Sequence, residues 1–274
     1  MLSTTYLQNI AVKYQTTHLN VRREYVQHLL LSYLYQQPQS SDLYFKGGTA
    51  LRLMYRSPRF SEDLDFDTPL HDHNIWEHVI ENSLVSVAKE SVGVDIQESK
   101  TTTGGYFGSV VISTIGDPIT IHIEISFRKD RVTGELFTIE NDFVPSYLLK
   151  SLRTDLLVDG KLHALFTRQK ARDFYDLYFI LRANMISVKQ KQQLTKVIDL
   201  LSFCACVRDA WQGLDRQAET NSPRRVSRHL QLCSTFRSRV PSLFRDLQVL
   251  QGCSKPCRGR ERYITPNARS HRRC

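Results

Sequence analysis

No run of apolar residues in this sequence approaches the roughly 20 that a membrane-spanning helix requires. The first residues also lack a basic stretch followed by an apolar one, so we find no secretory signal. Cysteine is absent before residue 204, and the overall composition excludes a small disulfide-stabilised scaffold, a collagen-like fibre and wholesale disorder. These absences lead us to expect a globular protein of the cytoplasm with no membrane as a partner.

The composition is otherwise ordinary, with 41% hydrophobic and 24% charged residues over 274 positions, but the charge is unevenly distributed. Residues after 200 hold 15 of the 37 Lys and Arg and only 5 of the 28 Asp and Glu, and 14 of those 15 basic residues are Arg. The net charge of +9 therefore arises in the last part of the chain and does not mark the whole protein as a nucleic-acid binder. The six cysteines follow the same division: Cys204, Cys206, Cys233, Cys253, Cys257 and Cys274.

The periodicity of apolar residues predicts an α+β fold, with a mixed β-sheet and helices followed by a helical module. The clearest strand is 119–127, where five apolar side chains alternate with polar ones. The other predicted strands are 63–67, 94–99 and 106–112, and a short apolar run at 43–45 precedes a glycine pair. Helices are predicted over 6–36, 50–56, 75–92, 146–167 and 173–183.

Asp63 and Asp65 are the first candidates for chemistry. Positions i and i+2 of a strand point to the same side, so the two carboxylates lie close together, and a cation is needed to offset their like charge. Carboxylate oxygens suit Mg²⁺ or Mn²⁺. A solvated loop is the alternative reading of this short motif, and Asp67 is either a third member or merely exposed.

A glycine pair, Gly47 and Gly48, stands upstream of the two aspartates and is followed by Thr49. Glycine lets the backbone approach a ligand, and the N-terminus of the following helix offers free N–H groups to phosphate. The spacing is not that of a Walker A loop. The plainer reading is a tight turn in which Thr49 caps the helix.

Downstream, Glu124 shares one face of the strand 119–127 with His122. Glu124 is either a third carboxylate beside the aspartate pair, able to complete a two-metal site or accept a proton, or a half-exposed sheet residue. His122 either contacts the residues of this site without binding the metal itself, or is simply exposed.

The last cluster contains both basic and acidic residues. Lys161 and Arg168 are seven residues apart, so they share a face if their helix is continuous, and together they can hold a triphosphate. Arg172, Asp173 and Asp176 follow at helical spacing. The competing reading is a network of surface ion pairs, which we favour for Asp176.

Three separated motifs in this order resemble the AbiEii/AbiGii toxin family, over roughly residues 40–185. The motifs are FKGGTALRLMYRSPRFSEDLDFD, then Glu124 on its strand, then GKLHALFTRQKARDFYDLYFIL. The resemblance implies a nucleotidyltransferase of the DNA polymerase β-like superfold. The implied roles are metal binding by Asp63, Asp65 and Glu124, catalysis by these three with Lys161, and nucleotide binding by Gly47, Gly48, Thr49, Lys161, Arg168, Arg172 and Asp173.

The resemblance also implies partners and domain boundaries. The family transfers a nucleotide from an NTP, several relatives modify the 3′ end of tRNA, and members pair with a cognate antitoxin that is often a winged-helix regulator. Several members act in phage abortive infection. We expect residues 1–145 to form the nucleotidyltransferase core, 146–200 a helical module that completes the active site, and 201–274 an atypical tail.

The tail has three readings. It is a basic RNA-binding extension, a zinc element around Cys253 and Cys257, or the product of a shifted reading frame. We favour the last, because lysine loss, the onset of cysteine and the loss of family pattern coincide near residue 200.

For the whole protein, the leading expectation is a toxin that transfers a nucleotide to RNA, with tRNA as the best candidate. The alternatives are a nucleotidyltransferase acting on a small molecule such as an aminoglycoside, and a degraded toxin that only binds its antitoxin.

Overall fold

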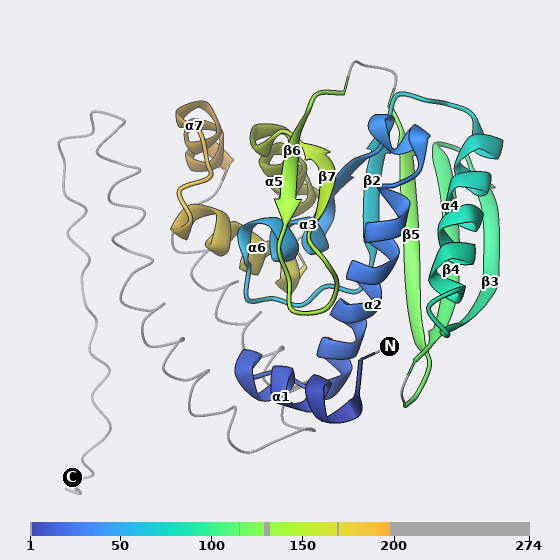
Figure 1. Ribbon diagram of the computed structural model, residues 1–274. Helices are drawn as coiled ribbons and strands as arrows, with labels where there is room; N and C mark the ends of the chain where they lie inside the picture. The colour runs from blue at the N-terminus through green and yellow to red at the C-terminus, as the bar shows by residue number, and fades with distance from the viewer. Residues whose placement is uncertain (1, 115, 129–131, 169, 198–274) are drawn as a thin grey trace, which may run out of the picture.

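The computed structural model describes residues 2–114, 116–128, 132–168 and 170–197, and its described part is built on one mixed sheet of seven strands (Figure 1). The strand order is β3-β4-β5-β2-β1-β7-β6. β2 pairs with β5, and β1 with β7, in parallel, whereas the remaining neighbours are antiparallel. The strands are β1 (Tyr44–Lys46), β2 (Leu64–Thr68), β3 (Gly93–Thr102), β4 (Gly105–Ser113), β5 (Ile119–Phe127), β6 (Gly134–Ile139) and β7 (Tyr147–Leu152).

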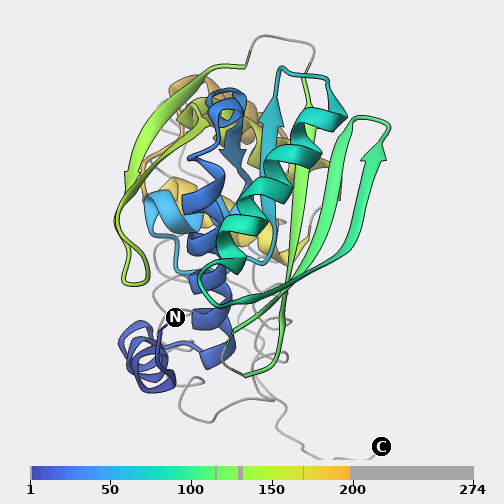
Figure 2. The ribbon, with the colours of Figure 1, turned by 45° about the vertical axis from the view of Figure 1, so that its right-hand side comes forward.

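Helices cover one face of this sheet completely enough to bury its apolar side chains. α2 and α4 pack on this face, against β3, β4, β5 and β7 (Figures 1 and 2). Trp76 of α4 and Leu30 of α2 are fully buried. The described helices are α1 (Thr4–Tyr14), α2 (His18–Leu34), a 3₁₀ turn η1 (Pro38–Asp42), α3 (Gly47–Tyr55), α4 (His73–Ala88), α5 (Thr154–Arg168), α6 (Ala171–Arg182) and α7 (Val188–Val197).

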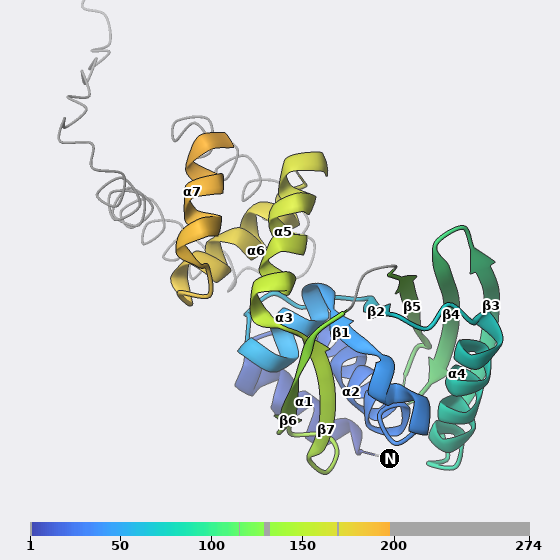
Figure 3. The same ribbon diagram turned by 90° about the horizontal axis from the view of Figure 1, so that it is seen from above.

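The opposite face is covered only in part. α5, α6 and α7 stand at the side of β1 and α3, and no described helix lies over the outer face of β3, β4 and β5 (Figure 3). That face carries the polar residues of the alternating strand β5, and it is the face on which the predicted carboxylates lie.

Most of the predicted elements are confirmed. Strand β5 occupies 119–127 as predicted, and its four isoleucines are buried while Thr120, His122 and Glu124 are exposed. The strands predicted at 63–67, 94–99 and 106–112 correspond to β2, β3 and β4, and the helix of 75–92 corresponds to α4. None of the described helices is both long and apolar enough to cross a membrane.

Two predicted helices were wrong in part. The helix predicted over 6–36 is two helices, because Gln15 takes a left-handed conformation (φ 51°) and the Thr17 side chain caps α2. The helix predicted over 146–167 begins only at Thr154, since 147–152 forms β7 and pairs with β6. The sheet therefore extends past residue 145, where we expected the core to end.

Candidate active site

The parallel register of β2 and β5 brings the predicted acidic residues together. Asp65 lies directly opposite Glu124, and Asp63 precedes β2 by one residue. The Oδ1 atom of Asp63 is 3.3 Å from Nδ1 of His122, which lies two residues before Glu124. Asp65 and Glu124 thus occupy neighbouring positions on two paired strands, and Asp63 lies just before the first of these strands.

The pKa of the Asp65 carboxyl is shifted from its ordinary value. The pKa of Asp65 is raised to about 6, because burial, together with the negative charges of Glu124 and Asp63, outweighs the opposite effect of Lys46 and Lys161. Ionisation of Asp65 therefore costs free energy, and a bound cation would remove that cost.

Gly47 begins α3 and lies against Asp65. Its φ is +86°, a conformation that side chains rarely adopt, and a Cβ added there would overlap the Asp65 carboxylate. Lys46, not Thr49, is the N-cap of α3. The glycine therefore lets the helix start beside the carboxylate, with the first N–H groups of α3 at the same place.

Replacing Gly47 by Ala is expected to destabilise the fold by about 1–3 kcal/mol, because the backbone conformation is strained and the Asp65 side chain must move. Urea unfolding measures this effect. Gly104→Ala is the control, since a Cβ there meets no atom within 4 Å. Equal stability of both variants would show that Gly47 is not sterically required.

The other two residues of the turn have structural roles in this structure. Thr49 is fully buried, and its hydroxyl donates to the backbone carbonyl of Asp63 at 2.5 Å. Gly48 is buried as well, because the Arg59 guanidinium occupies the space of its missing side chain. Thr49 and Gly48 support the carboxylate segment and do not line the neighbouring cavity.

That cavity has a volume of about 700 Å³ and lies between the sheet and α5. Asp65 and Gly47 line one side, and Lys161 and Arg168 line the other, on a helix that is continuous through Gly160. The cavity therefore joins a carboxylate, a helix N-terminus and two cations, which is the combination that a triphosphate requires.

Asp176 holds Lys161 in place, and our preference for a surface role of Asp176 was wrong. It is 1% exposed, accepts from Lys161 Nζ at 2.8 Å, and accepts from two nitrogens of Arg59 at 2.8 and 3.0 Å. Although burial alone raises it, Lys161 and Arg59 together lower the pKa of Asp176 below its ordinary value.

Asp173 plays the corresponding part for Arg168. It is 1% exposed, accepts a bidentate contact from Arg168 and accepts from the backbone N–H of Lys170 at 3.0 Å. Asp173 thus caps the first turn of α6 and orients Arg168, and is not itself among the residues that line the cavity. Arg172 is exposed on α6 and also lies outside the cavity lining.

Besides the ion pairs of Asp176 and Asp173, the structure contains a third group of ion pairs, around Asp67, that the sequence did not predict. Asp67 is buried and accepts from Lys46 Nζ at 2.6 Å and from Arg128 Nε at 2.8 Å. Lys46 also donates to the Ser126 hydroxyl at 3.1 Å. The reading of Asp67 as exposed was therefore wrong, and its fixed neighbours Lys46 and Arg128 add two cations to the cavity.

The chemistry of Asp63, Asp65 and Glu124 fits a hard divalent cation, because all three offer oxygen ligands and Asp65 ionises against its neighbours. Within the described ranges, no three Asp, Glu, His or Cys side chains are gathered around one point as a ready-made metal site. The three-ligand set stays a prediction.

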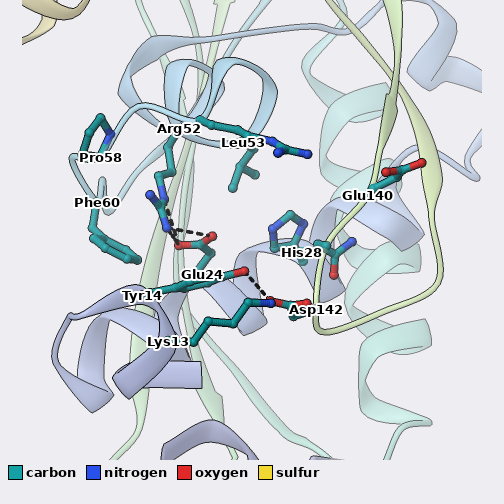
Figure 4. A pocket seen from close by; sticks show the side chains of 12 residues that line it. Lys13, Tyr14, Glu24, His28, Arg52, Leu53, Pro58, Phe60, Glu140 and Asp142 are labelled. Carbon is teal, nitrogen blue, oxygen red and sulfur yellow. Dashed lines mark hydrogen bonds and ion pairs between the residues drawn. The ribbon is translucent and has the colours of Figure 1, made fainter. Parts of the chain in front are cut away.

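A second cavity, of about 580 Å³, contains none of the predicted site residues (Figure 4). It lies between α1, α2, α3 and the segment before β7. Arg52 pairs with buried Glu24 at 3.0 Å, and Lys13 and Tyr14 both donate to Asp142. Burial lowers the pKa of His28 to about 3, so this histidine is neutral. These contacts fasten α1 to the rest of the fold.

The chain was compared with known proteins. Residues 28–227 match the family model described as the nucleotidyl transferase AbiEii toxin of type IV toxin–antitoxin systems. The chain belongs to this AbiEii family. The match confirms the resemblance on which the sequence analysis relied. No curated protein matches the sequence.

Several solved structures share the fold seen here. A putative nucleotidyltransferase from H. pylori has a TM-score of 0.60 and 21% identity, covering 85% of this chain and 98% of its own. JHP933 from Helicobacter pylori has a TM-score of 0.50 and 22% identity, covering 74% and 97%. MenT4, a nucleotidyltransferase toxin from Mycobacterium tuberculosis H37Rv, has a TM-score of 0.53 and 18% identity, covering 91% and 99%.

The AbiEii match continues past residue 200, where we expected the family pattern to be lost, so that expectation was wrong for residues 201–227. The predictions of a shifted frame, an RNA-binding extension and a zinc element concern 201–274, which lie outside the described residues.

Proposed function

We propose that this AbiEii-family toxin transfers a nucleoside monophosphate from an NTP to RNA, with the 3′ end of tRNA as acceptor, in a reaction that depends on Mg²⁺ or Mn²⁺. The observation that carries the proposal is the cavity in which Asp65 and Gly47 face Lys161 and Arg168. Its cations suit a triphosphate, and the adjacent carboxylates suit the reacting end of that triphosphate.

Each residue has a role in this proposal. Lys161 and Arg168 bind the phosphates, and the N–H groups at the start of α3 bind a further phosphate oxygen. The cation would be held by Asp63, Asp65 and Glu124. It would neutralise the charge of the phosphates and activate the acceptor hydroxyl.

The reaction forms one bond and breaks one. The acceptor hydroxyl oxygen bonds to the α-phosphorus, the bond from that phosphorus to the bridging oxygen breaks, and pyrophosphate leaves. Glu124 accepts the hydroxyl proton, because it is the carboxylate of the three that is exposed on the outer side of the sheet. Lys161 offsets the charge that develops on pyrophosphate.

The proposal places the protein in the cytoplasm, together with NTPs, tRNA and a cognate antitoxin. The antitoxin is proposed because the matched family is one of toxin–antitoxin systems. A role in phage abortive infection belongs to the same proposal.

The test is to incubate the purified full chain with Mg²⁺, total tRNA and each radiolabelled NTP in turn. Label on RNA is expected for one nucleotide with the wild type, and transfer is expected to fall by about 10²–10³-fold or more with Asp63→Ala, because the phosphate charge is then less well neutralised. The Asp95→Ala variant, which alters an exposed aspartate of β3, serves as control.

Full activity of Asp63→Ala would overturn the proposed site. Label on an aminoglycoside and not on RNA would replace the acceptor by a small molecule. Folded wild-type protein that labels neither acceptor, yet binds its antitoxin, would point to a degraded toxin.

A further inference from the structure

The row of residues that contains Asp65 and Glu124 continues across β4 and β3, on the face over which no described helix lies. In β4, Phe107 lies directly opposite Glu124, and in β3, Lys100 lies directly opposite Phe107. On the other side, Lys46 of β1 lies opposite Asp65. One line across five strands therefore leads from the cation-lined cavity, through the carboxylates, to an aromatic ring and a lysine.

The far end of this row forms a small aromatic surface. The ring of Phe107 is partly exposed, and its centroid is 5.8 Å from that of His122. The Lys100 ammonium lies over the Phe107 ring at 4.9 Å and pairs with Glu98 at 2.6 Å. The described part of the chain places no helix over this side of β3, β4 and β5 (Figure 3). We call Phe107, His122 and Lys100 the aromatic platform.

The in-line geometry of nucleotidyl transfer determines which substrate lies over this platform. In nucleotidyl transfer the attacking oxygen and the leaving pyrophosphate lie in line on opposite sides of the α-phosphorus. In the proposed function, the triphosphate binds in the cavity beneath α5, which Lys161 and Arg168 line. The acceptor must then approach over β5 and β4, where Glu124 and Phe107 are adjacent.

We infer that the aromatic platform binds an unpaired nucleotide of the RNA acceptor, with its base stacked on Phe107 and its phosphate beside Lys100. This inference rests on the proposed function and names the acceptor subsite of the same site. A partly exposed phenyl ring stacks on any base. The Lys100 side chain is able to move from the ring to a phosphate, because Lys100 and Glu98 are both about half exposed. An aminoglycoside has no aromatic face to stack.

The test uses the full chain with Phe107 changed to Leu, which keeps an apolar side chain and removes the ring. The KM for the RNA acceptor is expected to rise by about 10- to 100-fold, as one lost stacking contact predicts, while the KM for the NTP changes by less than about two-fold. Phe107→Tyr is expected to keep near wild-type values. Phe137→Leu, on the distant strand β6, is the matched control.

Direct binding provides the second measurement. Fluorescence anisotropy follows a labelled single-stranded RNA oligonucleotide on each variant in Mg²⁺, and weaker binding is expected for Phe107→Leu only. Wild-type affinity of that variant, with thermal melting showing both proteins folded, would overturn the inference whatever the transfer assay gives. Selective loss of binding together with no transfer by the wild type would support the platform and overturn the proposed reaction.

Discussion

Replacing Asp65 by Asn is expected to abolish nucleotidyl transfer and, at pH 7.5, to make the folded chain more stable by about 1–3 kcal/mol. The stabilisation arises because Asp65 is ionised at that pH although burial and the charges of Glu124 and Asp63 oppose its ionisation. Asn fills the same volume with no charge. Loss of activity with a gain in stability distinguishes an active-site carboxylate from one that holds the fold together.

The sign of the pH dependence follows from the pKa of Asp65, which rises from an ordinary value of 3.8 to about 6 in the folded chain. Between these values the folded state binds more protons than the unfolded state, so this group lowers the free energy of unfolding as pH rises through that window. Two units correspond to about 3 kcal/mol as an upper bound. Below about pH 4 the wild type and Asp65→Asn should converge.

Urea unfolding at several pH values measures this difference, and a second series with Mg²⁺ adds an activity-independent readout. Mg²⁺ is expected to stabilise the wild type at pH 7.5 and to have little effect on Asp65→Asn, since the cation relieves the repulsion that Asn has already removed. Asp63→Asn is the control, because that carboxylate is 37% exposed and should give a smaller gain. A less stable Asp65→Asn at pH 7.5 would contradict the account.

The elements that the sequence predicted well are those whose burial is set by local alternation. β5 is the clearest case, because every second residue from Ile119 is apolar and faces the helices. The segment 147–152 was misread because YLLKSL lacks a clean period of two, and its pairing with β6 on one side and β1 on the other makes it a strand. The break after α1 was missed because its left-handed residue is Gln15 and not a glycine.

The residues of the candidate site also divide into those that a local pattern predicted and those that it did not. Asp63, Asp65, Gly47 and Glu124 were found because each stands in a short motif or on a strongly patterned strand. Asp173 and Asp176 were named, but the pairing of Asp176 with Arg59 was not found, because these two residues are 117 apart in the chain. This pairing depends on how the segment between α3 and β2 meets α6 in space, which no local pattern encodes.

Asp176→Asn is expected to destabilise the chain by about 3–5 kcal/mol, the cost of leaving buried cations without their counter-ion. Lys161 and Arg59 are 11% and 18% exposed in their side chains, and both pair with this single carboxylate. Because the pKa of Asp176 is held below its ordinary value, the stabilisation it provides is present near neutral pH and is lost as the carboxyl is protonated in acid. Urea unfolding at neutral and acidic pH measures both effects.

The control for Asp176→Asn is Asp155→Asn, which breaks an exposed pair with Arg153 and should reduce stability far less. A second readout separates positioning from stability. If Asp176 directs Lys161 to the triphosphate, the surviving folded protein should show a higher KM for the NTP, and Lys161→Met should raise it in the same way. An unchanged KM for the NTP in Asp176→Asn would mean that the carboxylate serves the fold alone, and that Lys161 reaches the cavity without it.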